Sequence, residues 1–502
     1  MCNAVKLVPP VLRPGNSVLV YFQDALDRVF SSRLNPMHNL GAIGYFFFWA
    51  LLGTGLYLYL FYDMSVEGAY NSVQRITENQ KYYGGIIRSA HRYASAGLVL
   101  VAALHMLQTL FSDRFRKYRW LAWVSGVAIL PFIWLEGLTG YAMVFDEKGK
   151  MASIKFAEWL DVFPMAVEPF SRNFIQHGSL STLFFFVLTY SHLTIPIIML
   201  VALWVHCMRI SRPLIHVPKE LAVALGLLLL AVSVALPAVS EPVADLTKLV
   251  ASTDMDWFYL FPFPLVDALS ASAISAWLFS FGALALLSLL PWMIRGSKEA
   301  AAIGTAPAMV DLAHCTGCEL CQKACPFEAI DIKPRSDGRN YPTEVEILPE
   351  RCASCGLCLP ACPFPALSIG TWTHDYFVQR FDALFSQGGK GKTMLFVCER
   401  VVSDMEAINA LEGCAVMVIP CMGILGARAI AASLKHGANG VVVAACVSHD
   451  SHYRLSQRKL DLTKVEIGNI KRLKVIEATL SDPDAMLDGI RQARAGFQKE
   501  EA

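Results

Sequence analysis

Charged residues are scarce in this chain, and their scarcity argues against a soluble protein. Asp, Glu, Lys and Arg make up 17% of the 502 residues, where soluble domains have about 25%, and hydrophobic residues make up 55%. The net charge is only +1 and no basic tract is interleaved with aromatic residues, so we expect no nucleic-acid partner. We also expect no cleavable signal peptide, because prolines at positions 9, 10 and 14 interrupt the N-terminal segment.

Long apolar runs recur up to about residue 295 and then stop. Each run is long enough for a helix across a hydrocarbon core of roughly 30 Å, so the sequence predicts a membrane all-α bundle of six transmembrane helices. Before the runs, residues 17–32 have the apolar spacing of a helix that lies on the membrane surface. The runs are at about 40–62, 91–111, 121–144, 182–208, 220–239 and 270–294.

The basic residues predict the orientation of the bundle. Arg and Lys gather after the second, fourth and sixth runs, whereas the loops on the other side carry mixed or acidic charge. The positive-inside rule therefore places both termini, and everything after residue 295, in the cytoplasm of a bacterial or archaeal cell, with the bundle in its inner membrane. A reducing cytoplasm suits the cysteines, which all lie between Cys315 and Cys446 apart from Cys2 and Cys207.

Two of the predicted spans carry histidine pairs with the same spacing. His91 and His105 lie fourteen residues apart on the second span, as do His192 and His206 on the fourth. Fourteen helical steps return a side chain to nearly the same face, about 21 Å further along the axis. A satisfied core histidine is the alternative at any one position. Because polar residues in lipid are costly and neutral imidazole suits iron, the pattern favours two bis-histidine haems, formed by His91 with His192 and by His105 with His206.

Glycines repeat this spacing on the intervening spans. Gly41 and Gly55 lie on the first span, and Gly126 and Gly140 lie on the third. Glycine allows a flat macrocycle or a neighbouring helix to approach the backbone closely. Ordinary helix packing explains any one pair but not the shared spacing, so we expect these glycines to border the haems.

Residues 16–295 resemble cytochrome b of the bc-type quinol-oxidising complexes. The segments YYGGIIRSAHRYASAGLVLVAALHM and GLTGY and the second histidine pair carry the resemblance. It implies a low-potential haem near the outer face, a high-potential haem near the cytoplasm, and sites for quinone or quinol. The residues implied are His91 and His192 for the first haem, His105 and His206 for the second, and Arg88 near a propionate.

The outer quinol site of that family is altered here. Its Pro-Glu-Trp-Tyr motif is replaced by MDWF, in which Asp256 takes the place of the proton-accepting carboxylate and Trp257 follows. An acidic residue at the start of an interfacial helix is the alternative for Asp256. MVFDEKGK replaces the Leu-Pro-Trp-Gly that the family has after the third span, so we do not expect an ordinary Rieske partner. Arg209, Arg212 and His216 are candidates for an inner quinone pocket, although positive-inside anchoring explains the arginines equally well.

Two copies of a cysteine pattern follow the membrane segment. CTGCELCQKACP and CASCGLCLPACP both have the form C-x2-C-x2-C-x3-C-P of bacterial ferredoxins with two [4Fe–4S] clusters, in which the fourth cysteine of each run binds the other cluster. Zinc is the alternative, but two complete runs with their prolines argue against it. The predicted ligands are Cys315, Cys318, Cys321 and Cys362 for the first cluster, and Cys352, Cys355, Cys358 and Cys325 for the second.

From about residue 391 the chain alternates between strand and helix patterns, which predicts a small parallel α/β domain. Cysteines end three predicted strands, so their thiolates should share one sheet edge. A [2Fe–2S] cluster is one interpretation, and buried apolar cysteines are the other. The residues concerned are Cys398, Cys421 and Cys446, with His449 and His452 nearby.

The same region resembles the delta subunit of methyl-viologen-reducing hydrogenase. IPC, LKHGANGVVVAAC and HDSHY carry this resemblance, which covers about residues 391–480. It implies a docking role towards flavoproteins of the heterodisulfide-reductase A type or other flavin or NAD(P)H redox subunits. Because the family has further cysteines where Val401 and Ser451 stand, the docking role has more support than the cluster.

Together these patterns predict four parts: 1–36 with the surface helix, 37–295 as a cytochrome b-like transmembrane domain, 305–370 as a cytoplasmic ferredoxin-type α+β module, and 391–490 as the α/β domain. We expect a subunit of a quinone-linked oxidoreductase complex that couples quinone chemistry through two b-type haems to iron–sulfur clusters and a docked flavoprotein, with electron bifurcation as an option. A homodimer of the cytochrome part and further membrane or periplasmic cytochrome subunits are also expected. The alternatives are a quinol–cytochrome c complex with a Rieske partner, and a membrane scaffold for a soluble redox enzyme.

Overall fold

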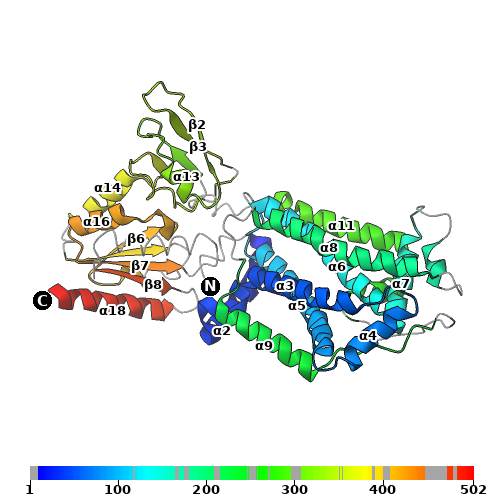
Figure 1. Cartoon of the computed structure of the whole chain (residues 1–502). Helices are drawn as coiled ribbons and strands as arrows, with labels where there is room; N and C mark the ends of the chain where they lie inside the picture. The colour runs from blue at the N-terminus through cyan, green and yellow to red at the C-terminus, as the bar shows by residue number, and fades with distance from the viewer. Residues whose placement is uncertain are drawn as a thin grey trace.

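A computed structural model of the chain places an elongated helical bundle beside two smaller modules that contain all the strands in the part it describes (Figure 1). The colour gradient in Figure 1 shows that the chain completes the bundle before it enters these modules. The residues described are 9–116, 119–163, 169–174, 180–208, 215–245, 247, 256, 258–269, 272–294, 307–349, 351–352, 354–386, 391–398, 408–446, 472–478 and 483–501.

Five helices among the described residues are long and apolar enough to cross a bilayer. Three of them contain an internal proline, which a membrane helix tolerates because neighbouring helices satisfy the released carbonyl. The predicted helical membrane domain is therefore confirmed. The five are α3 (Leu40–Phe61), α5 (Gly84–Phe111), α6 (Trp120–Val144), α8 (Thr182–Met208) and α11 (Ala273–Met293).

The fifth of the six predicted spans, at about 220–239, is not confirmed. The helix found there is α9 (Lys219–Ala235), whose 17 residues extend about 25 Å, short of a hydrocarbon core of roughly 30 Å. Prolines bound α9 on both sides. Pro218 precedes its first turn, and Pro237 disfavours the helical conformation of Leu236.

The central bundle consists of two helix pairs. α3 packs along α5, and α6 packs along α8. Phe48 of α3, Ile129 of α6 and Met199 of α8 form a buried cluster between the pairs. This arrangement brings the helices with the predicted histidines, α5 and α8, next to the helices with the predicted glycines, α3 and α6.

Shorter helices flank the bundle. α2 contains the predicted surface helix and exposes Val18, Tyr21, Phe22 and Val29, as expected for a helix whose apolar side chains face lipid. The flanking elements are the 22-residue α2 (Arg13–Leu34) and the shorter η1 (Pro10–Leu12), η2 (Pro36–His38), α4 (Gly68–Glu78), α7 (Glu147–Leu160), η4 (Phe170–Phe174) and α10 (Pro262–Ala268).

The cysteine-rich segment forms a small module of two antiparallel strand pairs. β1 (Ala308–Val310) precedes the first cysteine run and pairs with β4 (Leu367–Ile369), which follows the second run. β2 (Ile330–Pro334) pairs with β3 (Thr343–Ile347), and α13 (Leu320–Ala324) lies inside the first run. Cysteines make up a large part of the module's core, as is usual for domains too small to be held by apolar packing alone.

The C-terminal module is a parallel four-stranded sheet in the order β6-β5-β7-β8. β5, one of the two inner strands, is buried along its whole length, as parallel strands covered on both faces are. α14 and α16 cover one face and α18 covers the other, which confirms the predicted α/β fold. The elements are α14 (His374–Phe385), β5 (Thr393–Cys398), β6 (Cys414–Ile419), η6 (Met422–Ile424), α16 (Ala427–Lys435), β7 (Gly440–Cys446), β8 (Leu473–Ala478) and α18 (Pro483–Glu501).

Candidate functional site

Histidines from α5 and α8 face each other inside the bundle. The ring centres of His91 and His192 are 6.5 Å apart, and their planes are inclined by 57°. A bond between zinc and an imidazole nitrogen is about 2.0–2.1 Å long, so two metal–nitrogen bonds in line span about 4 Å. The rest of the 6.5 Å is the distance from each nitrogen to the centre of its own ring. One iron atom therefore fits between the two rings. Nearer the other ends of α5 and α8, His105 and His206 lie within electrostatic range of each other.

Each of these histidines rests against one of the four predicted glycines. The glycines thus accommodate the imidazoles themselves, which is more specific than the general proximity to a macrocycle expected from the sequence. A side chain at Gly55, Gly126 or Gly140 would require its histidine to shift by a few tenths of an ångström, and one at Gly41 would touch its histidine. A β-carbon would lie 3.1 Å from Cε1 of His91 at Gly55, 3.3 Å from His192 at Gly140, 3.2 Å from His206 at Gly126 and 3.4 Å from His105 at Gly41.

Hydroxyl groups fix the orientation of three of the imidazoles. Oγ1 of Thr54 donates to the carbonyl of Ala50 at 2.7 Å and lies 2.9 Å from Nδ1 of His91. Because the hydroxyl hydrogen goes to the carbonyl, Nδ1 must carry the proton, and Nε2 keeps its lone pair for a metal. The same relationship holds at 2.9 Å between Thr139 and His192 and at 3.0 Å between Ser125 and His206.

His105 lacks such a partner. Its Nδ1 is buried and forms no hydrogen bond with any residue that the structure describes. The other three glycines each follow a threonine or serine, but Gly41 follows Leu40. This hydroxyl-glycine pattern was visible in the sequence, and the sequence analysis did not use it.

Glu136 is a further residue that the sequence analysis missed. It is the only charged residue in α6. Its Oε1 lies 3.3 Å from Nε2 of His192, and its Oε2 is buried without a hydrogen-bond partner among the described residues. An ionisable residue inside a membrane helix usually marks a functional site. Because Nε2 is the nitrogen that would bind iron, this carboxylate must turn aside when a haem is present.

Arg88 lies one helical turn before His91. It donates to the hydroxyl of Thr77 at 2.5 Å and to that of Ser240 at 2.7 Å. These two hydrogen-bond partners are neutral, and the carboxylate of Asp146 also lies within electrostatic range of the guanidinium. The arrangement suits the predicted role of Arg88 near a haem propionate.

Asp256 connects three segments of the membrane domain. Its Oδ1 accepts hydrogen bonds from the backbone N–H groups of Phe258, Tyr259 and Leu260 at 2.7–3.1 Å. Its Oδ2 accepts from the hydroxyl of Tyr141 at 2.5 Å and lies 3.5 Å from Arg92. Asp256 thus both caps the turn before α10 and belongs to a polar cluster. Trp257, the other residue predicted at this site, lies outside the described residues.

The segment that replaces Leu-Pro-Trp-Gly forms a helix start. Asp146 caps α7 by accepting from the N–H of Gly149 at 2.8 Å, and it also accepts from the N–H of Glu241 at 3.0 Å. The C-terminal end of α6 is thereby tied to the segment that follows α9. This structural use of Asp146 explains how the altered sequence is accommodated.

The predicted inner quinone residues are placed only in part. His216 is exposed between α8 and α9, and Arg209 and Arg212 lie outside the described residues. The inner pocket therefore stays a prediction.

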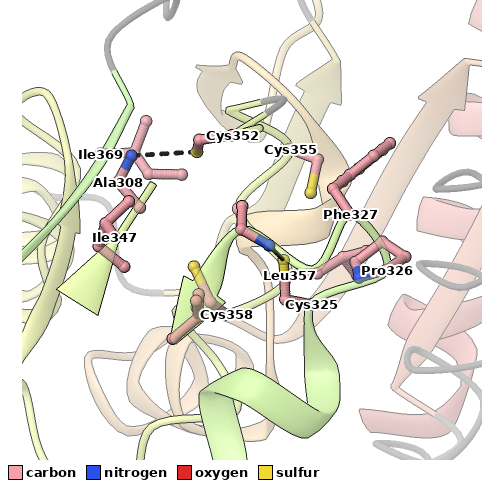
Figure 2. Close-up of a pocket in the computed structure, with 13 residues that line it drawn as sticks. Ala308, Cys325, Pro326, Phe327, Ile347, Cys352, Cys355, Leu357, Cys358 and Ile369 are labelled. Atoms are coloured by element: carbon pink, nitrogen blue, oxygen red, sulfur yellow. Dashed lines mark hydrogen bonds between the residues drawn. The ribbon is translucent and has the colours of Figure 1, made fainter. Parts of the chain in front are cut away.

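The eight ferredoxin cysteines line two cavities, four in each, as the predicted cross-ligation requires. One cavity is lined by Cys315, Cys318, Cys321 and Cys362, and the other by Cys325, Cys352, Cys355 and Cys358. Figure 2 shows the four thiols of the second cavity around a common space, with Pro326 and Phe327 beside Cys325. Within the described residues no three metal-binding side chains converge on a single-ion site.

The two cysteine runs also repeat each other in backbone conformation. Gly317 and Ser354, third in their runs, have φ of 69° and 54°, and Glu319 and Gly356, fifth in their runs, have φ of 61° and 78°. Two of these are not glycines, so the left-handed turns carry strain that the module must hold. Backbone N–H groups reach the sulfurs, as from Ala308 to Cys352 at 3.3 Å (Figure 2). Thiolates of a cluster need such donors.

At the sheet edge the predicted cysteines are brought together only in part. Cys398 ends β5, and Cys421 lies two residues beyond the end of β6 because Pro420 intervenes. Sγ of Cys398 lies 3.9 Å from the carbonyl of Pro420. Cys446 ends β7, but its side chain, like His449 and His452, lies outside what the structure describes. The [2Fe–2S] cluster therefore stays a prediction.

Facing imidazoles in a membrane bundle and thiols around two cavities define an integral membrane electron-transfer protein. Comparison with known sequences assigns the chain to a family. The family described as Cytochrome b/b6/petB matches residues 25–213, the 4Fe-4S dicluster domain matches 314–366, and the methyl-viologen-reducing hydrogenase delta subunit matches 396–478. The chain belongs to the cytochrome b/b6 family, and all three predicted resemblances are confirmed. It is a multi-pass membrane protein of a family that binds b-type haem, with an iron–sulfur module attached.

Individual relatives agree with this assignment. The chain is 32% identical over 148 residues to cytochrome b6 of Heliomicrobium gestii, covering 30% of this chain and 68% of that protein. It is 34% identical to cytochrome b6 of Heliobacterium mobile, covering 27% of this chain and 63% of the relative. A solved structure titled "Hyperthermophilic respiratory Complex III" aligns with a TM-score of 0.42 and 19% identity, over 52% of this chain and 78% of the other.

Proposed function

We propose that this chain is a quinone-linked electron-transfer subunit that connects a membrane quinone or quinol, through two b-type haems and two [4Fe–4S] clusters, to a docked redox subunit. The observation that carries the proposal is the 6.5 Å separation of the His91 and His192 rings, which fits one iron, in a chain that also holds eight cysteines around two cavities. The bound cofactors would supply one-electron transfer. His91 and His192 would hold the outer haem, His105 and His206 the inner haem, and Arg88 a propionate.

The inner haem would face the iron–sulfur modules. Nη1 of Arg116, just after α5, donates to the carbonyl of Ile294, just after α11, at 3.1 Å. The C-terminal ends of α5 and α11 therefore lie at the same end of the bundle, and His105 is nearer to it than His91. The positive-inside rule would make this end cytoplasmic, so both termini and the iron–sulfur modules belong on that side. This placement requires the chain to cross the membrane once more between α8 and α11, along α9 and the segment that follows it.

The polar cluster around Asp256 supports a quinol site at the outer end. A carboxylate beside Tyr141 and Arg92 could accept a quinol proton once Tyr141 yields its hydrogen bond. The delta-subunit-like domain supports a docked flavin-containing subunit of the heterodisulfide-reductase A type, and further cytochrome subunits and a dimer of the cytochrome part belong to the same proposal. Electron bifurcation at such a flavin remains an optional part of it.

Two alternatives predict different compositions. In a quinol–cytochrome c complex with a Rieske partner the ferredoxin would be an extra exit, but Asp146 caps a helix where the family has Pro-Trp-Gly. In a scaffold the C-terminal domain would only anchor a soluble enzyme, and quinol would reduce the haems without reducing any cluster.

Metal content and quinol reduction test the proposal. Purified full-length protein should contain two haems and eight cluster irons, or ten if the C-terminal cluster exists. Quinol should reduce both haems and then the clusters. His105→Ala should lose one haem and quinol-driven cluster reduction, whereas His436→Ala, which alters a half-buried histidine paired with Asp382 in the α/β domain, should lose neither. Fewer than eight cluster irons, or two haems retained in His105→Ala, would overturn the assignment.

A further inference from the structure

The second cysteine cavity adjoins the α/β domain. The loop from Cys355 to Pro360 packs against the segment from Cys421 to Gly426, which follows β6. A β-carbon on Gly356 would lie 2.2 Å from Cγ2 of Ile424, and one on Gly426 would lie 2.4 Å from Cβ of Pro360. Distances this short leave no room for a side chain, so the two segments are in direct contact. We refer to this as the Gly356–Ile424 contact.

A thiol from each side lies at this contact. Cys355 directly precedes Gly356 on one side, and Cys421 begins the segment that contains Ile424 on the other. Its sulfur accepts a hydrogen bond from the N–H of Gly423 at 3.4 Å, which fixes it at the start of η6.

The first cavity is placed differently. Cys318 of the first cavity is exposed, although Cys315 and Cys321 there are buried, and no cysteine that lines the second cavity is exposed. The described residues around both cavities lie within the ferredoxin module, between Ala308 and Ile369. Leu359, in the second cysteine run, packs against the ferredoxin core and also against the α/β core with Met422 and Ile424. One cluster site therefore faces outwards and the other is covered by the C-terminal domain.

We propose that the second cluster exchanges electrons with the α/β domain across the Gly356–Ile424 contact, while the first cluster exchanges them with the haem side. This assignment rests on the proposed function. Electrons move singly: the cluster held by Cys318 is oxidised by one electron as the cluster held by Cys355 is reduced by one, no bond forms or breaks, and no proton moves. The acceptor beyond the contact is a flavin of the docked subunit, which takes up two electrons in two such steps.

Electron paramagnetic resonance of the full-length, cluster-loaded protein tests the assignment. Cys318→Ser and Cys355→Ser each remove or alter one cluster signal and thereby identify it. Cys421→Ser should then shift the midpoint potential and line shape of the signal that Cys355→Ser identifies, and leave the other signal unchanged. Cys414→Ser is the matched control, because Cys414 is the first residue of β6 and Cys421 follows the other end of that strand. It should shift neither signal.

A second variant tests the contact without altering a thiol. Ile424→Ala removes the side chain that meets Gly356 and should speed chelator removal of the second cluster several-fold, with the first cluster lost at the normal rate. Equal effects on both clusters, effects on neither, or a Cys414→Ser shift as large as that of Cys421→Ser would overturn the assignment. Failure of quinol to reduce the haems would instead overturn the proposed function and leave these spectra as they are.

Discussion

The hydroxyl of Thr54 accepts a hydrogen bond from Nδ1 of His91 at 2.9 Å. A hydrogen bond of this kind makes the ligand more basic and stabilises ferric iron, which lowers the haem potential. Both outer histidines have such a partner, but at the inner pair only His206 does, and Nδ1 of His105 has none among the described residues. The outer haem should therefore have the lower potential.

Thr54→Ala is expected to raise the midpoint potential of the outer haem. A hydrogen bond worth about 0.5–1.5 kcal/mol corresponds to roughly 20–60 mV for one electron. Leu40→Thr should have the opposite effect on the inner haem, because it offers His105 the hydroxyl that it lacks. Spectroelectrochemical titration of both haems measures the two shifts. If Thr54→Ala moves both haems equally, the effect is structural and the hydrogen bond does not set the potential.

Gly55→Ala is expected to reduce the haem content from two towards one per chain. The added β-carbon would lie 3.1 Å from Cε1 of His91, so the imidazole must shift from its position for iron. Gly53→Ala is the control on the same helix, since a β-carbon there meets nothing within 4 Å. The haem-to-protein ratio of the purified variants decides the matter, and equal loss in both variants would contradict the proposed role of Gly55.

Asp337→Asn is expected to make the first cluster more labile. Arg335 donates to the carbonyls of Cys315 at 2.6 Å and Leu312 at 2.7 Å, and Asp337 orients its guanidinium. The hydrogen bond from Arg335 lowers the pKa of Asp337 from 3.8 to about 2. Because the pKa of this carboxyl is lower in the folded than in the unfolded protein, its ionised form stabilises the fold at every pH above the pKa of the unfolded chain. This stabilisation is lost as the pH falls from about 4 through 2.

The lability caused by Asp337→Asn should therefore be the same at pH 5 and pH 8. Decay of cluster absorbance in the presence of a chelator measures it. Glu346→Gln, which alters an exposed pair with Lys333 on the same hairpin, is the control and should behave like the wild type. A lability that changes steeply between pH 5 and 8 would show that another group controls the loop.

Asp256→Asn is expected to slow quinol-driven haem reduction by about 100-fold, the lower end of general-base effects. Asparagine keeps an oxygen acceptor for the three backbone N–H groups, so the turn before α10 should survive the change. Stopped-flow haem reduction measures the rate, and a haem content of two verifies the fold. Asp267→Asn, which alters a surface pair with Lys155, should leave the rate unchanged. An unchanged rate in Asp256→Asn would show that Asp256 only caps the turn before α10 and accepts no proton from quinol.

The histidine geometry was predictable because the rise and twist of a helix are constant. A spacing of fourteen residues fixes both the face and the depth of His91 and His105 before any tertiary structure is known. The cysteine runs were predictable for a similar reason, since their ligand pattern is local. The span predicted at about 220–239 is not confirmed, because apolar composition does not reveal how Pro218 and Pro237 bound a helix.

Other parts of the site depend on contacts between distant segments. Tyr141 donates a hydrogen bond to Asp256, which is 115 residues further along the chain, and no local sequence pattern predicts that pairing. Glu136 could have been found, because it is the one charge in an apolar run, but its position beside His192 required the packing of α6 against α8. Cys421 was expected to end a strand, and Pro420 moves it beyond β6 towards the second cavity.

The Gly356–Ile424 contact has a kinetic consequence, because both of its sides belong to one polypeptide. Separate proteins would have to collide before an electron could pass, at a rate set by their concentrations. Tethering replaces that collision with an effective concentration on the order of millimolar or above. Dilution of the protein should therefore leave this step unaffected, and only the encounter with the docked subunit should depend on how much of each protein the cell contains.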